Sequence, residues 1–118
     1  MREDITSLFF CVSLDLSSNL GKYKILKGIT TVAGSNTFSC GFKPKIIIVC
    51  LQTQVIYVNT EEDSNNQYLY PLTTSDPKPI SYKLNYGTNK SGLIEEITED
   101  GFKFGISSSK SIFVVARG

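Results

Sequence analysis

A run of six apolar residues, Ile46 to Leu51, constrains the fold of this chain more than any other stretch. The run is short, rich in β-branched side chains and without polar alternation, which is typical of a strand covered on both faces. Gly41 and Pro44 precede it. Glycine can take a positive φ in a turn, and proline fixes its own φ. The stretch therefore predicts a sharp turn that feeds one strand in the middle of a core.

Short β-rich runs recur along the rest of the chain. Strands are expected over Ile5–Leu16, Tyr23–Leu26, Ile29–Ala33, Thr37–Cys40, Val55–Val58, Tyr68–Tyr70, Ile80–Tyr86, Leu93–Ile97, Phe102–Ile106 and Ile112–Ala116. A helix is the alternative for Ile5–Leu16, but its apolar residues fit a period of two better than one of 3.6. A spacing of roughly 8 to 12 residues between strands is typical of a β-sandwich or barrel.

Turn signals separate these runs. Gly28 is expected to end the first of two neighbouring strands, and Gly34-Ser35-Asn36 predicts a hairpin loop. Gln52-Thr53-Gln54 predicts the turn after which Val55–Val58 pairs with Ile46–Leu51 as an antiparallel hairpin. Asp100-Gly101 is a pair favoured in tight hairpin turns. The sequence thus predicts an all-β fold: an antiparallel, jelly-roll-like β-sandwich of about eight strands in a single domain.

Composition excludes several classes of function. The 118 residues include 12 Lys and Arg, 11 Asp and Glu and no histidine, for a net charge of +1. Such a balance gives no electrostatic reason to expect nucleic acid or an anionic membrane as partner. No apolar window approaches the roughly 20 residues of a membrane span, and no signal peptide is recognised. Three cysteines, Cys11, Cys40 and Cys50, are expected to be free thiols, which favours a reducing cytoplasm.

Acidic residues form two groups. Glu61, Glu62 and Asp63, with Asn65 and Asn66, offer oxygen atoms that calcium prefers, but their spacing matches no calcium loop, so a solvated loop is expected.

The second group, Glu95, Glu96, Glu99 and Asp100, raises the hypothesis of a small glycan hydrolase, which needs two facing carboxylates. Neighbours on a strand point to opposite faces, so a solvated edge is preferred. The serines of Ser107–Lys110 lie in a turn, away from any nucleophile motif. No catalytic residue, cofactor or metal site is expected.

Tyrosines are concentrated in the middle of the chain. Tyrosine is enriched at recognition surfaces because its ring is large, fairly rigid and amphipathic. The candidate recognition residues are Tyr57, Tyr68, Tyr70, Tyr82 and Tyr86. A surface of this kind, with Asn and Gln, would bind a sugar or a protein. The alternative is that the rings pack in the sheet and leave only their hydroxyls in water.

Three short motifs occur in a familiar order. Gly41-Phe42-Lys43-Pro44-Lys45 leads into a strand of Ile and Val, Asp100-Gly101-Phe102-Lys103-Phe104 follows as a hairpin, and Ile112–Gly118 is an apolar ending. With these motifs the chain resembles small tail-fibre and baseplate-associated proteins of bacteriophages, especially those of Gram-positive hosts. The resemblance covers residues 28–118. Residues 1–27 fall outside it and are expected to form an attachment segment with the first strand or strands.

The resemblance implies a non-enzymatic structural or adhesion module of the virion, of β-sandwich type and commonly trimeric. Such a module would be assembled in the host bacterial cytoplasm and would contact other virion proteins and host-surface glycans in the tail tip, fibre or baseplate. A head decoration or capsid accessory protein is the alternative. The structural markers of the resemblance are Gly41, Phe42, Pro44, Gly101 and Phe102.

Overall fold

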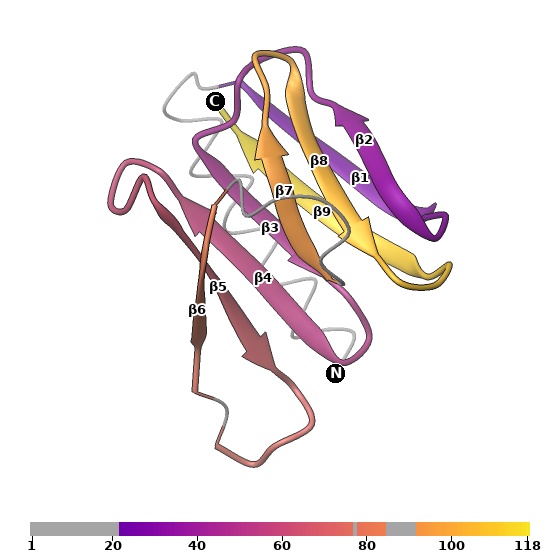
Figure 1. Cartoon of the computed structure of the whole chain (residues 1–118). Coiled ribbons are helices and arrows are strands. Elements are labelled where there is room, and N and C mark those ends of the chain that lie inside the picture. The colour runs from indigo at the N-terminus through magenta and orange to yellow at the C-terminus, as the bar shows by residue number, and fades with distance from the viewer. Residues whose placement is uncertain (1–21, 77, 85–91) are drawn as a thin grey trace.

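A computed structural model describes residues 22–76, 78–84 and 92–118 of the chain. In these residues the chain forms nine β-strands and no helix (Figure 1). The strands are β1 (Tyr23–Thr30), β2 (Gly34–Ser39), β3 (Ile46–Cys50), β4 (Gln54–Asn59), β5 (Asn66–Pro71), β6 (Ile80–Lys83), β7 (Leu93–Ile97), β8 (Gly101–Ile106) and β9 (Ser111–Arg117). No helix of the described ranges is long and apolar enough to cross a membrane.

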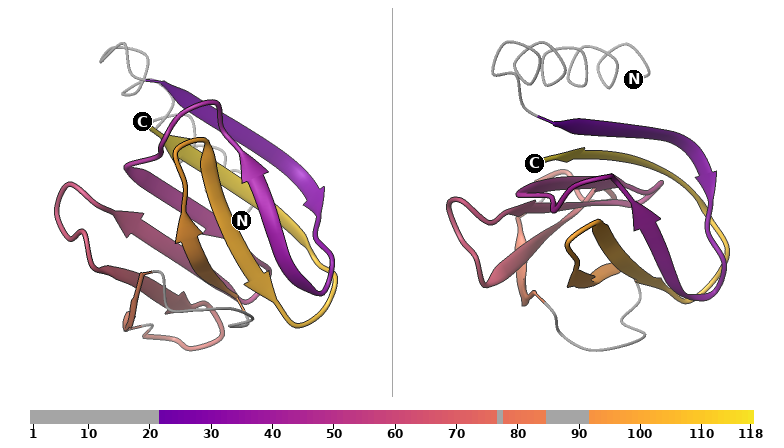
Figure 2. Two further views of the ribbon diagram at one scale, coloured as in Figure 1. Left: turned by 45° about the horizontal axis from the view of Figure 1, so that its top comes forward. Right: turned by 90° about the horizontal axis from the view of Figure 1, so that it is seen from above.

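Two antiparallel sheets lie face to face. One has six strands in the order β1-β9-β3-β4-β5-β6, and the other has three in the order β2-β8-β7. The three-stranded sheet lies across one face of the larger sheet, of which β1 and β6 are the edge strands (Figures 1 and 2). The all-β antiparallel sandwich predicted from the sequence is confirmed.

The core lies between the two sheets. Phe102 and Phe104 of β8 are fully buried there, and the Phe102 ring lies 5.2 Å from that of Phe38, centroid to centroid. From the larger sheet, the opposing side chains are Ile47, Val49, Ile56, Val58, Ile112 and Val114. Because these are alternate residues of β3, β4 and β9, the pleat itself selects them for the inner face.

The run at residues 46 to 51 alternates after all. Ile47, Val49 and Leu51 are buried, whereas Ile46, Ile48 and Cys50 on the outer face are half-buried. The prediction that this strand is buried on both faces therefore holds fully only for its inner face. The predicted hairpin of β3 with β4 is present, with Val49 opposite Ile56, and β3 is an interior strand between β9 and β4.

The segment between β1 and β2 differs from the prediction. Gly28 does not end a strand: with φ of +60° it lies where the pairing of β1 with β9 shifts between Leu26 and Ile29, so β1 bulges and continues. Gly34 begins β2 rather than forming a hairpin loop, because β1 and β2 belong to different sheets. Their connection is a corner, held by Asn36, whose side-chain oxygen accepts a hydrogen bond from Val32 N at 2.8 Å.

The residues of the Gly41–Lys45 and Asp100–Phe104 motifs lie at positions that restrict the backbone conformation or the size of the side chain. Gly41 has a φ of +83°, the left-handed conformation that favours glycine. Pro44 and Phe102 are buried, and Phe42 packs partly buried against the core. A Cβ added to Gly101 would lie 1.8 Å from the Phe38 carbonyl oxygen, because β2 and β8 approach closely there.

Gln67 joins the two sheets. Its side chain is fully buried, and its amide nitrogen donates to the Ile94 carbonyl at 2.8 Å and to the Lys83 carbonyl at 3.1 Å. Its amide oxygen accepts from Ile94 N at 2.7 Å. The Gln67 side chain therefore makes the two hydrogen bonds to Ile94 that a neighbouring strand would otherwise make. In this way the buried backbone N–H and carbonyl of Ile94 are both satisfied.

The boundary expected after residue 27 falls inside β1, which pairs with β9 from Tyr23 to Thr30. The start of β1 is held in place because Gly118 N donates to the Lys22 carbonyl at 2.8 Å. The expected strand over Ile5–Leu16 and Cys11 lie outside the described residues.

Candidate recognition surface

Three of the candidate tyrosines share the outer face of the six-stranded sheet. Tyr57 of β4 pairs directly with Tyr68 of β5, and Tyr70 lies on the same face as Tyr68, two residues along the strand. Ile56 and Val58, which flank Tyr57 on β4, are buried in the core. The alternation of the strand therefore turns the tyrosine rings away from the core.

The three rings line one shallow pocket. It has a volume of about 390 Å³ and is lined by Tyr57, Asn59, Glu62, Asp63, Tyr68, Tyr70 and Pro79. We call these residues the tyrosine surface. Asn59 ends β4, while Glu62 and Asp63 belong to the turn that leads to β5. The surface thus combines aromatic rings and one amide on strands with carboxylate groups on the adjoining turn.

Asp63 holds the turn against the strand. Its carboxylate accepts from the Tyr68 hydroxyl at 2.6 Å, from the Asn66 side chain at 3.0 Å and from Asn65 N at 3.0 Å. These donors favour the charged carboxylate, the Tyr68 hydroxyl most of all, and lower the pKa of Asp63 to about 2. The same hydrogen bond raises the pKa of Tyr68, because the neutral hydroxyl is the donor.

Asn59 orders the other side of the pocket. Its side-chain nitrogen donates to Glu62 at 2.6 Å and to the Tyr57 hydroxyl at 3.2 Å, and its oxygen accepts from Glu61 N at 3.1 Å. The hydroxyls of Tyr57 and Tyr68 therefore each have a polar partner, Asn59 at the end of β4 and Asp63 in the turn. Groups held in this way are positioned before any ligand arrives, which lowers the entropy lost on binding.

The remaining two tyrosines do not join this surface. Tyr82 of β6 pairs with Gln67 and packs, half-buried, against the core. Ser81, which pairs with Tyr68, and Lys83, which pairs with Asn66, are the β6 residues on the outer face. Tyr86 lies outside the described residues. Ile80, the first residue of the edge strand β6, is 46% exposed.

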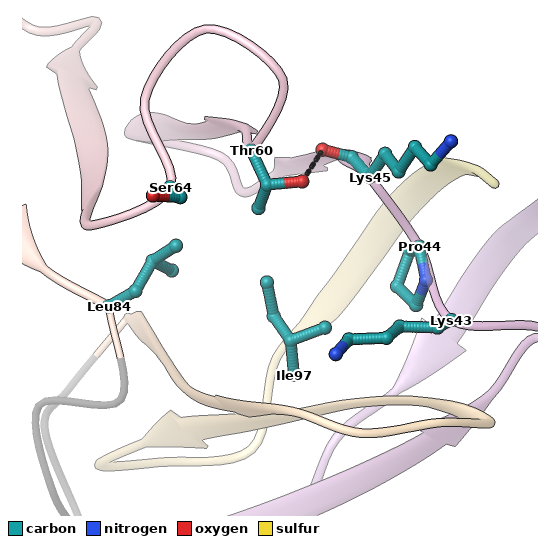
Figure 3. A pocket seen from close by; sticks show the side chains of 7 residues that line it. All are labelled: Lys43, Pro44, Lys45, Thr60, Ser64, Leu84 and Ile97. Carbon is teal, nitrogen blue, oxygen red and sulfur yellow. Dashed lines mark hydrogen bonds between the residues drawn. The ribbon is translucent and has the colours of Figure 1, made fainter.

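A second hollow lies at the edge of the sandwich (Figure 3). It has a volume of about 460 Å³ and is lined by Lys43, Pro44, Lys45, Thr60, Ser64, Leu84 and Ile97. Leu84 and Ile97 point into it, and the Thr60 hydroxyl donates to the Lys45 carbonyl at 3.0 Å. The Lys43 ammonium is already paired with Glu99 at 3.3 Å. Its residues come from separate segments of the sequence, so no local pattern predicts this hollow.

The carboxylates of the hydrolase hypothesis do not converge. Glu96 pairs with Lys103 at 3.6 Å, Glu99 with Lys43, and Asp100 accepts from Ser39. Neither hollow is lined by any of the four acidic residues of that hypothesis.

Glu95 was expected on a solvated edge, and this prediction is wrong. It is buried and accepts a hydrogen bond from Ser35. Ser35 pairs with Gly105, and Gly105 also pairs with Leu93 of the strand that carries Glu95. Glu95 lies where the pairing of β7 with β8 shifts between Ile94 and Glu96, a bulge that changes which face its side chain takes.

The other candidates serve the fold. Glu61 is paired with Arg117 rather than left to a cation. The Ser109 hydroxyl donates to the Thr31 carbonyl at 2.6 Å, and Lys110 N donates to the Thr31 hydroxyl at 2.9 Å. Within residues 22–76, 78–84 and 92–118, no three His, Cys, Asp or Glu side chains group as a metal would require.

Comparison of the chain with protein-family models, with curated proteins and with solved structures finds no match. The tyrosine surface is therefore interpreted from its own geometry.

Proposed function

We propose that this chain is a non-enzymatic structural and adhesion module of a bacteriophage virion that contacts host-surface glycan through the tyrosine surface. The observation that supports the proposal is the convergence of Tyr57, Tyr68 and Tyr70 on one pocket with Asn59 and Asp63. Aromatic rings offer flat apolar faces to the C–H groups of a sugar ring. Amides and carboxylates beside them offer partners for sugar hydroxyls.

The scaffold suits this role. The rings stand on β4 and β5, whose inner residues are fixed in the core, and the polar groups are held by the turn. A rigid platform with pre-ordered polar groups is what weak, repeated contacts with a glycan surface need, and several copies in one virion would add avidity. The motifs Gly41–Lys45 and Asp100–Phe104 support the assignment to the tail tip, fibre or baseplate, as a homotrimer among other virion proteins.

A glycan array tests the binding proposal. The full chain is expected to bind a subset of bacterial surface glycans without releasing product. Tyr57→Ala and Tyr70→Ala should each lower the affinity by about tenfold or more, the usual effect of removing an aromatic anchor. Tyr23→Ala is the matched control, because Tyr23 is 43% exposed and lies on β1 outside the pocket. Equal loss in Tyr23→Ala, or product release, would contradict the proposal.

Location and assembly need separate measurements. Immunogold labelling of intact phage particles is expected to mark the tail, whereas labelled heads would favour the capsid alternative. Light scattering on the purified chain measures the solution mass, for which a trimer is expected.

A further inference from the structure

The outer face of the six-stranded sheet carries a second group of side chains, this time apolar. Ile25 of β1 pairs with Val115 of β9, Val115 pairs with Ile48 of β3, and Phe113 pairs with Cys50. These five residues form one cluster that is separate from the core between the sheets. We call it the outer patch. It covers β1, β9 and β3, whereas the tyrosine surface covers β4 and β5.

The outer patch is not a normal solvent-facing surface. Val115, at its centre, is 2% exposed, and the four residues around it are half-buried although they point away from the core. An antiparallel sheet with one wet face usually carries polar side chains there. A continuous apolar group of this kind indicates a contact that excludes water.

The sequence supplies an occupant. Residues 1–21 precede the described part of the chain and enter it at Lys22, directly before the edge strand β1 of the outer patch. The segment is rich in large apolar residues: Ile5, Leu8, Phe9, Phe10, Cys11, Val12, Leu14, Leu16 and Leu20. Its point of entry is fixed by the hydrogen bond from Gly118 N to the Lys22 carbonyl, 2.8 Å.

Length permits the contact. An extended segment of this size reaches about 70 Å, and a helical one about 30 Å. Neighbouring strands lie about 4.8 Å apart, so β1, β9 and β3 together span roughly 10 Å and either conformation reaches across them.

A second copy fits the patch less well. Specific interfaces use roughly 20 to 30 residues on each side, and the outer patch has five. A segment tethered next to the patch, in contrast, binds at a high effective concentration without any partner.

From these observations we infer that residues 5–16 pack on the outer patch of their own chain and seal it. The segment is then part of the folded domain rather than a free attachment arm. Its apolar side chains cover Val115 and its neighbours on β1, β9 and β3, and leave the tyrosine surface open.

Thiol labelling of the full chain tests this inference, because Cys50 belongs to the outer patch and Cys40 lies in the core. Peptide mass spectrometry follows each cysteine separately. Phe10→Asp with Val12→Asp should raise the labelling rate of Cys50 by about tenfold or more, as expected when a local cover opens. Ser17→Asp with Ser18→Asp adds the same charge at polar positions and should leave the rate unchanged. Cys40 should stay slow in every variant.

Two outcomes would overturn the inference. Equal labelling of Cys50 in the unmodified chain and in the Phe10→Asp, Val12→Asp variant means that the segment does not cover it. Protection that disappears on dilution of the unmodified chain means that a second copy does. Should the variant unfold, as fast labelling of Cys40 would reveal, amide hydrogen exchange of residues 5–16 in the unmodified chain decides. Protected amides support the inference, and exchange at unstructured rates contradicts it.

Discussion

The outer face of the six-stranded sheet has two halves, the outer patch and the tyrosine surface. Both belong to the same sheet and lie over the same core, yet their side chains differ in chemistry. On β1, β9 and β3 the outer patch consists of Ile25, Ile48, Cys50, Phe113 and Val115. On β4 and β5 the tyrosine surface combines three tyrosines with Asn59 at the end of β4 and with Glu62 and Asp63 of the adjoining turn. The inner residues determine how the sheets pack. The outward residues determine what each half contacts.

The largest expected effect lies in the core that both halves share. Phe102→Ala should lower the free energy of unfolding by about 3 to 5 kcal/mol, because a fully buried ring leaves a cavity. Urea unfolding measures it. Phe113→Ala, in the outer half-buried position, is the matched variant and should cost clearly less. Equal losses would show that the two faces of the sheet are equally important for stability.

Substitution of Gln67 should give the next largest loss of stability, and it should affect β5 and its neighbours more than β1 and β9. Gln67→Leu removes the partners of Ile94 N and of two carbonyls, at an expected loss of about 1 to 3 kcal/mol in unfolding free energy. Amide exchange should quicken in β5, β6 and β7, which the Gln67 side chain connects, and remain unchanged in β1 and β9. Uniform quickening would mean that the sandwich opens as one unit.

Acid should weaken the contacts of the tyrosine half. The pKa of Asp63 is lowered from 3.8 to about 2, so its charged contacts are complete above pH 4 and are lost as the pH falls through about 2. Tyr68→Phe removes the main cause and should raise this pKa toward 3.8, as measured by NMR titration of the carboxyl group. Tyr70→Phe is the control, since Tyr70 donates nothing to Asp63. An unchanged pKa in Tyr68→Phe would contradict the assigned hydrogen bond.

The smallest effect concerns the two described thiols. Burial raises the pKa of Cys40 and of Cys50 to about 11, so alkylation of both should increase with pH up to about 11 rather than 9. The neutral thiols favour the folded state, and this contribution is lost as the pH rises from 9 toward 11. Rates measured against pH for each cysteine check it. A midpoint near 9 for Cys50 would mean that the outer patch is wet.

Local signals were enough for the parts of the fold that are local. The hairpin of β3 and β4 and the Asp100-Gly101 turn follow from apolar runs and turn residues next to each other in sequence. The corner at Gly34 was missed because glycine, serine and asparagine also suit a hairpin loop. Whether two successive strands pair or pass to different sheets depends on contacts distant in sequence.

Much the same holds for the site. Tyr57, Tyr68 and Tyr70 were predicted as recognition residues, and the register of β4 with β5 brings them together. Tyr82 belongs to the inner face, which no count of tyrosines reveals, because the parity of β6 is set by its pairing with β5. Glu95 is buried where the pairing of β7 with β8 shifts between Ile94 and Glu96, and the alternation of β7 alone does not reveal such a shift.

The most direct test of the divided outer face is an NMR titration of the full chain with a glycan selected on the array. The ring signals of Tyr57, Tyr68 and Tyr70 are expected to shift together, while the signals of Ile48, Phe113 and Val115 stay unchanged. Shifts at the outer patch or around Lys43 and Ile97, with the tyrosine signals unmoved, would contradict the account.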